Sequence, residues 1–469
     1  MVVSAAGAAA RAAAHDALTA TLRRKYPLDL ALDETAAARA LSSQDRGFAR
    51  AIANETMRRF GQLDELTRHF VPRPPPPHRA GATLEILLAG TCELLFLDVA
   101  AHAAVDGANR LAAVDPKAVH FKPLINAALR RIAREGREVV AIQDAERLNT
   151  PDWLWTRWGD TYGEETTREI AKVHARTPPL DLHFRAPFFP PPLAWEAAPR
   201  AGEEQCADEN IEPPITSPLP GLRPDFPRKR GRKDLFGEIV RLEHAGNVEE
   251  LEGFREGAFW VQDFAASLPA RLFGDVRGLR AIDLCAAPGG KTAQLAAGGA
   301  HTIAVERDAA RLARLEQNLD RLKLEAELVL ADARDYQPER PADCVLLDAP
   351  CSATGTIRRH PELPWIKSAS DVAACSDAAS ELLDAAAGMV APEGVLVFAV
   401  CSLEPEEGPE QVAHFLRRHE EFRRAAIAAD EIFGLAELIT SDGDLRTLPC
   451  HLADEGGMDG FYAARLRRS

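Results

Sequence analysis

Residues 283–295 read DLCAAPGGKTAQL, and the class of fold predicted for the chain follows from this stretch. An apolar run ends at Leu284, glycines follow at positions 289 and 290, and KTAQL opens a helical pattern. Glycines let the backbone approach a ligand closely, and the first turn of a helix offers unpaired N–H groups. The stretch therefore predicts a strand, a ligand loop and a helix, although a tight structural turn has the same spacing. It matches neither Gly-x-x-x-x-Gly-Lys-Ser/Thr nor Gly-x-Gly-x-x-Gly.

Short apolar runs alternate with helical stretches on both sides of this loop. The strand candidates are Arg280–Leu284, His301–Val305, Glu327–Leu330, Cys344–Leu347 and Val395–Val400. Alternating strands and helices predict a doubly wound, mostly parallel, Rossmann-like α/β sheet. Ligands of such sheets bind at the carboxyl ends of the strands.

Two acidic residues follow strand candidates at this edge. Glu306 comes at the end of HTIAV, where an acidic residue can accept hydrogen bonds from ribose hydroxyls. Asp332 follows the next strand, where a carboxylate can accept from an adenine amino group. A solvent-exposed glutamate and a helix-capping aspartate are the structural alternatives at these positions.

Two cysteines, Cys351 in LLDAPCSATGT and Cys401 in FAVCSLE, follow the fourth and fifth strand candidates. Structural cysteines are usually buried and inert, which fits Cys344 and Cys92 better than these two. No histidine or cysteine partner has ligand spacing, so no metal site is expected. The shared position after a strand predicts that Cys351 and Cys401 belong to one site.

The chain divides into three regions. Residues 1–140 show apolar residues at helical spacing, for example in ALTATLRRKY and LEILLAGTCELLFL, and predict an all-α domain. Residues 141–235 form a connecting region whose proline-rich part, 186–235, has the composition of a linker or a disordered insertion. Residues 236–469 carry the α/β pattern.

Composition limits the function classes. The 469 residues exceed one domain. The eight cysteines are few for this length and include no Cys-x-x-Cys pair, which argues against a structural zinc site and against a secreted disulfide framework. No apolar run has the length of a membrane span, and we expect a cytoplasmic monomer. The net charge of −15 counts against a general polyanion binder. The basic run Arg223–Lys233 is either a solvated linker or a local RNA-binding patch.

The motifs CAAPGGK, LLDAPCSATGT and CSLEPEEG together resemble the signature loops of RNA 5-methylcytosine methyltransferases that use S-adenosylmethionine. The stretch VQDFAAS resembles the entry into their catalytic domain. LSSQDRGFARAI and LINAALRRI resemble the NusB-like helical RNA-binding domain of the bacterial RsmB/Sun type. The resemblance implies methyl transfer to carbon 5 of a cytosine, with 16S ribosomal RNA as the partner.

The same resemblance assigns roles to individual positions. Cys401 matches the nucleophile, Cys351 the thiol that helps to release product, and Asp348 a residue between cofactor and target base. Glu306 would contact the ribose and Asp332 the adenine. The residues expected to line S-adenosylmethionine are Cys285, Ala286, Ala287, Pro288, Gly289, Gly290, Lys291 and Asp348.

Carbon 5 of cytosine is too weak a nucleophile to take a methyl group unaided. A thiolate that adds at carbon 6 makes carbon 5 electron-rich, and a base must later remove the carbon 5 proton. DNA cytosine methyltransferases attack with the cysteine of a Pro-Cys loop, here Cys351. Because both loops match the RNA pattern, the resemblance assigns attack to Cys401 and places a base role on Cys351.

Basic residues after the Cys351 loop are candidates for phosphate contacts: Arg358, Arg359, His360 and Lys367. A charged loop face is the alternative. The chain departs from the resembled pattern at Val400, where threonine is usual, and at Glu306, where aspartate is common. The competing functions are transfer RNA methylation by the same chemistry and a non-catalytic RNA-binding module.

Overall fold

The computed structural model describes residues 5–184, 232–236, 239–243 and 246–469. The predicted proline-rich region 186–235 and the basic run Arg223–Lys233 therefore lie outside the described residues, except for positions 232–235. No helix in the described ranges is long and apolar enough to cross a membrane.

The described part of the first 140 residues is helical, which confirms the predicted all-α domain. Its helices are α1 (Ala5–Arg24), α2 (Leu28–Ala38), α3 (Ser43–Arg58), α4 (Phe60–Phe70), α5 (Pro77–Ala80), α6 (Thr83–Leu95), α7 (Ala101–Val114) and α8 (Lys122–Ala141). Helix α6 is buried on all sides because its sequence is apolar around most of its circumference, and it packs against α3, α4, α7 and α8. The proline block after Phe70 separates α4 from α5, as its missing N–H groups require.

The part of the connecting region that precedes the proline-rich stretch is folded. It contains α9 (Ala145–Leu148), α10 (Asp152–Tyr162), α11 (Glu164–His174) and strand β1 (Leu180–Phe184). Strand β1 joins β2 (Arg232–Leu235), β3 (Ile239–Leu242) and β4 (Phe259–Val261) in an antiparallel sheet of order β2-β3-β1-β4. The predicted boundary at residue 235 therefore falls inside the β2–β3 hairpin.

The second sheet carries the α/β domain. Its strands are β5 (Arg280–Leu284), β6 (His301–Glu306), β7 (Glu327–Leu330), β8 (Ala342–Asp348), β9 (Val390–Val400), β10 (Phe422–Arg424), β11 (Leu445–Thr447) and β12 (Phe461–Arg468). The order is β10-β12-β9-β8-β5-β6-β7, with β11 beside β12. Strands β5 to β9 are mutually parallel, and β12 runs antiparallel to β9. All five predicted strands are present, and the Rossmann-like prediction is confirmed.

Helices cover both faces of this sheet. They are α12 (Phe264–Arg271), α13 (Gly290–Ala297), α14 (Ala309–Leu322), α16 (Ala369–Ala387) and α17 (Pro409–Arg418). The short helix α15 (Leu363–Ile366) packs instead against α1 and α10. Alternate residues of each strand enter separate cores: Leu347 and Phe398 pack with α16 and α17, and Leu346 and Val397 pack with α12. Sequestering both faces leaves the carboxyl edge of the sheet as the place for a site.

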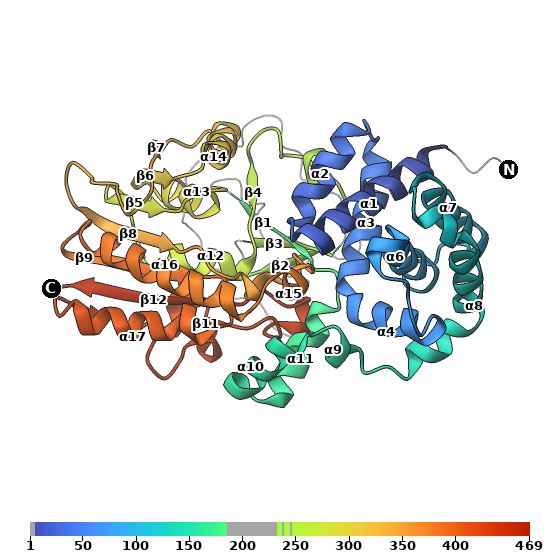
Figure 1. Ribbon diagram of the computed structural model, residues 1–469. Helices are drawn as coiled ribbons and strands as arrows, with labels where there is room; N and C mark the ends of the chain where they lie inside the picture. Colours follow the sequence, from blue (N-terminus) through green and yellow to red (C-terminus); the bar gives the residue numbers. More distant parts are fainter. Residues whose placement is uncertain (1–4, 185–231, 237–238, 244–245) are drawn as a thin grey trace, which may run out of the picture.

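That edge faces the N-terminal helices. In Figure 1, β12 points away from the helical domain, so its antiparallel neighbour β9 points toward it. The segment after β8 contacts these helices through Phe60 and Trp365, whose ring centroids are 4.7 Å apart. Trp153 Nε1, which lies on α10, donates to the carbonyl of Pro364 at 3.1 Å. The helices therefore enclose the carboxyl edge instead of standing apart from it.

Candidate active site

The two cysteines that follow β8 and β9 come together at the carboxyl edge of the sheet. The Sγ atoms of Cys351 and Cys401 lie 3.4 Å apart, and both side chains are partly buried. The strands bring them there because Asp348 pairs with Ala399 in parallel register, so the two chains leave the sheet side by side. The contact with Cys401, and next to it burial, raise the pKa of the Cys351 thiol well above its ordinary value.

A tight backbone crossing fixes this edge. The N–H of Gly355 donates to the carbonyl of Cys401 at 3.0 Å, and the N–H of Gly460 donates to the carbonyl of Gly355 at 2.8 Å. A Cβ atom on Gly355 would lie 1.9 Å from the Gly460 carbonyl oxygen, so only glycine allows this approach. The crossing ties the loop after Cys351 to Cys401.

A partly buried ion pair lies next to the thiols. Lys291 Nζ donates to Asp348 Oδ2 at 2.8 Å, and the Lys291 side chain is 9% exposed. Burial disfavours the ammonium form, but the Asp348 carboxylate outweighs burial and raises the pKa of Lys291. The ammonium also lies 5.0 Å from the ring centroid of Phe461. Lys291 was expected only in the cofactor loop, and the structure adds its pairing with the carboxylate of the β8 loop.

Residues Cys285–Lys291 run from the end of β5 through a glycine turn into the first turn of α13, as the sequence predicts. Gly289 has φ of 102°, which is left-handed, and a Cβ there would lie 3.0 Å from Leu315 Cγ. Helix α13 begins at Gly290, and its first turn presents N–H groups that have no intrahelical acceptor. This arrangement suits the close approach of a polar ligand.

The two predicted acidic residues flank this loop differently. Glu306 ends β6, is 2% exposed, and accepts from the N–H groups of Ala287 at 3.4 Å and Asp308 at 3.0 Å. Asp332 follows β7 and accepts a bidentate pair of hydrogen bonds from Arg334, from Nε at 2.9 Å and from Nη2 at 2.7 Å. That contact lowers the pKa of Asp332 to about 2, so its carboxylate remains an acceptor.

A buried acid that sequence reasoning left without a role lies under the loop. Asp283 is 0% exposed, and its Oδ2 accepts from Thr292 Oγ1 at 2.6 Å. Among the described residues its Oδ1 has no hydrogen-bond partner. Burial raises the pKa of Asp283 to about 7. Its place just before the glycine turn in the quoted stretch was the signal that could have singled it out.

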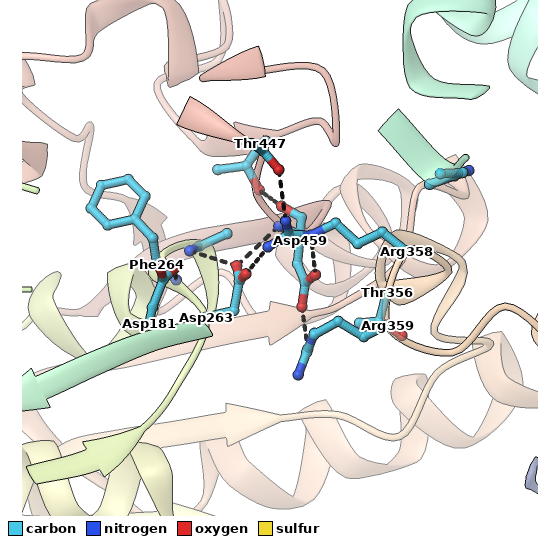
Figure 2. A network of polar contacts seen from close by, with 12 residues as sticks. Asp181, Asp263, Phe264, Thr356, Arg358, Arg359, Thr447 and Asp459 are labelled. Carbon is cyan, nitrogen blue, oxygen red and sulfur yellow. Dashed lines mark hydrogen bonds and ion pairs between the residues drawn. The ribbon is translucent and has the colours of Figure 1, made fainter. Parts of the chain in front are cut away.

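The predicted phosphate contacts are wrong for Arg358. Its side chain is 1% exposed, and its guanidinium pairs with the buried carboxylates of Asp263 and Asp459, the latter at 2.9 Å (Figure 2). A guanidinium held in this way cannot reach a phosphate. Burial disfavours its charge, but the two carboxylates prevail and raise the pKa of Arg358.

The other three predicted contacts lie nearer to solvent. Arg359 is 38% exposed and pairs with Asp459, as Figure 2 shows. His360 Nδ1 lies 3.4 Å from Asp29 Oδ2 of α2, and Lys367 is partly exposed. A role of these three residues in phosphate binding stays a prediction. Across the described ranges, no group of three or more His, Cys, Asp or Glu side chains is placed to hold a metal ion.

Comparisons with known proteins agree with this geometry. The family model "16S rRNA methyltransferase RsmB/F" matches residues 276–467, and the NusB family model matches residues 8–134. The ribosomal RNA small subunit methyltransferase B of Pseudomonas putida is 35% identical, with 97% of this chain and 98% of that protein covered. The chain belongs to the ribosomal RNA small subunit methyltransferase B family. The Vibrio cholerae member is 32% identical over 98% of this chain and 97% of its own.

The fold has a solved counterpart as well. The crystal structure of PH0851 covers 99% of this chain and is itself covered completely, with a TM-score of 0.72 and 23% identity. As a member of the methyltransferase B family, the protein is an RNA methyltransferase that uses S-adenosylmethionine. The residues at the β5–α13 loop fit that cofactor, because the glycine turn gives access. Asp283 Oδ1, at the end of β5, is also a buried acceptor that has no hydrogen-bond partner in the described part of the chain.

Proposed function

We propose that the protein methylates carbon 5 of a cytosine in small-subunit ribosomal RNA through a covalent bond between Cys401 and the base. The thiol pair carries this proposal: two sulfur atoms 3.4 Å apart lie at the edge of the sheet where the cofactor loop also ends. Neither a disulfide framework nor a metal site explains a pair of free thiols in this position. The NusB-family helices and the ribosomal RNA relatives support the choice of RNA.

Cys401 performs the attack in this proposal. Its Sγ bonds to carbon 6 of the cytosine, which places electron density on carbon 5. S-adenosylmethionine supplies the methyl group that carbon 5 takes up. The bond between Sγ and carbon 6 breaks after a base has removed the carbon 5 proton, so the thiolate is regenerated and one proton is released.

Cys351 is the base that this geometry favours for the last step. The Cys351 thiol first loses its proton to solvent, and the resulting thiolate takes up the carbon 5 proton, which returns the side chain to its thiol form. The raised pKa of Cys351 makes that thiolate a strong base. Asp348, which ends β8 three residues before Cys351 and pairs with Lys291, can accept a hydrogen bond from the cytosine amino group. The target cytosine must leave the stacked RNA to reach this edge of the sheet.

Transfer of labelled methyl groups to purified small-subunit ribosomal RNA and to transfer RNA tests the proposal. We expect label in the ribosomal RNA, located as 5-methylcytosine by bisulfite sequencing. We expect Cys351→Ala to accumulate a protein–RNA adduct on a denaturing gel, and Cys401→Ala to form none. The reverse pattern of adducts would assign the attack to Cys351, and label confined to transfer RNA would refute the ribosomal substrate.

A further inference from the structure

Each of the two thiols is followed by a serine, and both serines point to the same buried carboxylate. Ser352 Oγ donates to Glu407 Oε2 at 2.6 Å, and the Ser352 N–H donates to Glu407 Oε1 at 2.7 Å. Ser402 Oγ also donates to Glu407 Oε2. All three residues are 0% exposed. One carboxylate therefore bonds to both loops, directly behind the cysteines.

The carboxylate sits where it can act only through other residues. Glu407 ends the short 3-10 helix Pro405–Glu407 that follows Cys401, and its burial keeps it out of contact with any substrate. The two serine hydroxyls lie 3.3 Å apart, so the loops meet at the serines as well as at the sulfur atoms. The distance between the thiols is thus set one residue away from each of them.

We propose that Glu407 is a positioning residue that holds Cys351 and Cys401 at their working separation. This inference rests on the proposed function, since it gives the separation a purpose: the sulfur that attacks and the sulfur that removes the proton must reach neighbouring carbon atoms of one ring. A single carboxylate can hold two loops at a fixed distance because its two oxygen atoms can accept several hydrogen bonds at once.

The charge of Glu407 affects the pKa of Cys351, so its removal changes the reactivity of that thiol in a way that a simple loss of packing does not. Contact with Cys401, burial and then the negative charge of Glu407 all raise the pKa of Cys351. Burial raises the pKa of Glu407 itself, and the serine hydrogen bonds oppose that shift. Glu407→Gln keeps the shape but removes the charge, so Cys351 should become more acidic and react faster with iodoacetamide at a fixed pH.

The experiment compares Glu407→Gln and Glu407→Ala with the wild-type protein and with Glu410→Gln, a surface control on α17. Diamide takes one hydrogen from each thiol, and the rate at which Cys351 and Cys401 form a disulfide reports their approach without RNA. We expect the disulfide rate, divided by the iodoacetamide rate of the same variant to correct for the thiolate fraction, to fall in the order wild type, glutamine, alanine. Methyl transfer turnover should fall about 100-fold in the alanine variant, with an unchanged KM for the cofactor.

Wild-type disulfide rates and wild-type turnover in both Glu407 variants would overturn the proposal. If the alanine variant does not fold, Ser352→Ala and Ser402→Ala each remove one arm, and wild-type values in both would likewise overturn it. The proposed function fails separately, when the wild-type protein methylates no RNA. In that case the disulfide and iodoacetamide rates still decide whether Glu407 positions the two thiols.

Discussion

Replacing Arg157 by methionine tests whether the helices outside the catalytic sheet hold the loop that carries Cys401. Glu404 lies three residues after that cysteine and is 0% exposed. Arg157 Nε, on α10, donates to Glu404 Oε2 at 2.5 Å, and Trp158 Nε1 donates to Oε1 at 3.0 Å. The loop after β9 therefore depends on α10 to neutralise a buried carboxylate.

The magnitude follows from the burial of the pair. Removing one partner of a buried ion pair costs about 3 to 5 kcal/mol, because the other charge is left without compensation. Arg157 is 26% exposed, so water can replace part of its contribution, and we expect a loss of about 3 kcal/mol. At about 1.4 kcal/mol per factor of ten, the population with a displaced loop rises roughly 100-fold.

Hydrogen exchange of the peptide that covers residues 402–408 measures this displacement, and methyl transfer measures its effect on catalysis. We expect faster exchange and lower turnover in Arg157→Met. Adding Glu404→Gln removes the stranded charge and should restore much of both. Arg168→Met, which breaks a surface pair with Asp144, is the matched control and should change stability by less than about 0.5 kcal/mol. Simple additivity of Arg157→Met and Glu404→Gln would refute the reasoning.

Three other results are expected. Arg358→Leu strands the buried Asp263 and should destabilise the protein by about 3 to 5 kcal/mol in thermal unfolding, while the salt dependence of RNA binding stays the same. Burial lowers the pKa of His174 to about 3, so between about pH 6.5 and 3 the unfolded chain binds a proton that the folded one does not. The free energy of unfolding should therefore fall as the pH falls through that range. His174→Gln should make this free energy, measured by urea unfolding at each pH, depend less on pH. Lys291→Met removes the cation beside Asp348 and should lower turnover by about 100- to 1,000-fold in the methyl transfer assay.

The sequence predicts the parts of this protein that local patterns encode. The five parallel strands and the glycine turn at Gly289 could be placed because apolar runs and glycines act over a few residues. Cys351 and Cys401 could be grouped because parallel strands deliver their following residues to one edge. Their separation of 3.4 Å could not be predicted, because it depends on the Gly355 crossing and on side chains from elsewhere in the chain.

Arg358 shows why the rest could not be predicted. An arginine in a polar loop has the composition of a phosphate contact, and nothing near it in the sequence reveals its depth. Its partners, Asp263 and Asp459, lie 95 and 101 residues away. The four-stranded sheet was missed for a related reason: β1 is separated from β3 by a long proline-rich stretch, so no local pattern links the two strands.

The helical domain is part of the active-site scaffold, and a single arginine makes this case. Arg58 Nη1, at the end of α3, donates to the carbonyls of His174 at 2.9 Å and Arg358 at 2.8 Å. Burial lowers the pKa of Arg58 to about 10, which shows that burying this guanidinium costs electrostatic free energy. Two independent domains joined only by a linker would not require that cost. The segment after Cys351 is thereby held from the helical side by Arg58 and from the sheet side by Gly460. A helical domain that served only to dock RNA would not need the hydrogen bonds of Arg58 to the carbonyls of His174 and Arg358. A helical domain that also sets the position of the thiol loops needs a buried polar contact at this point.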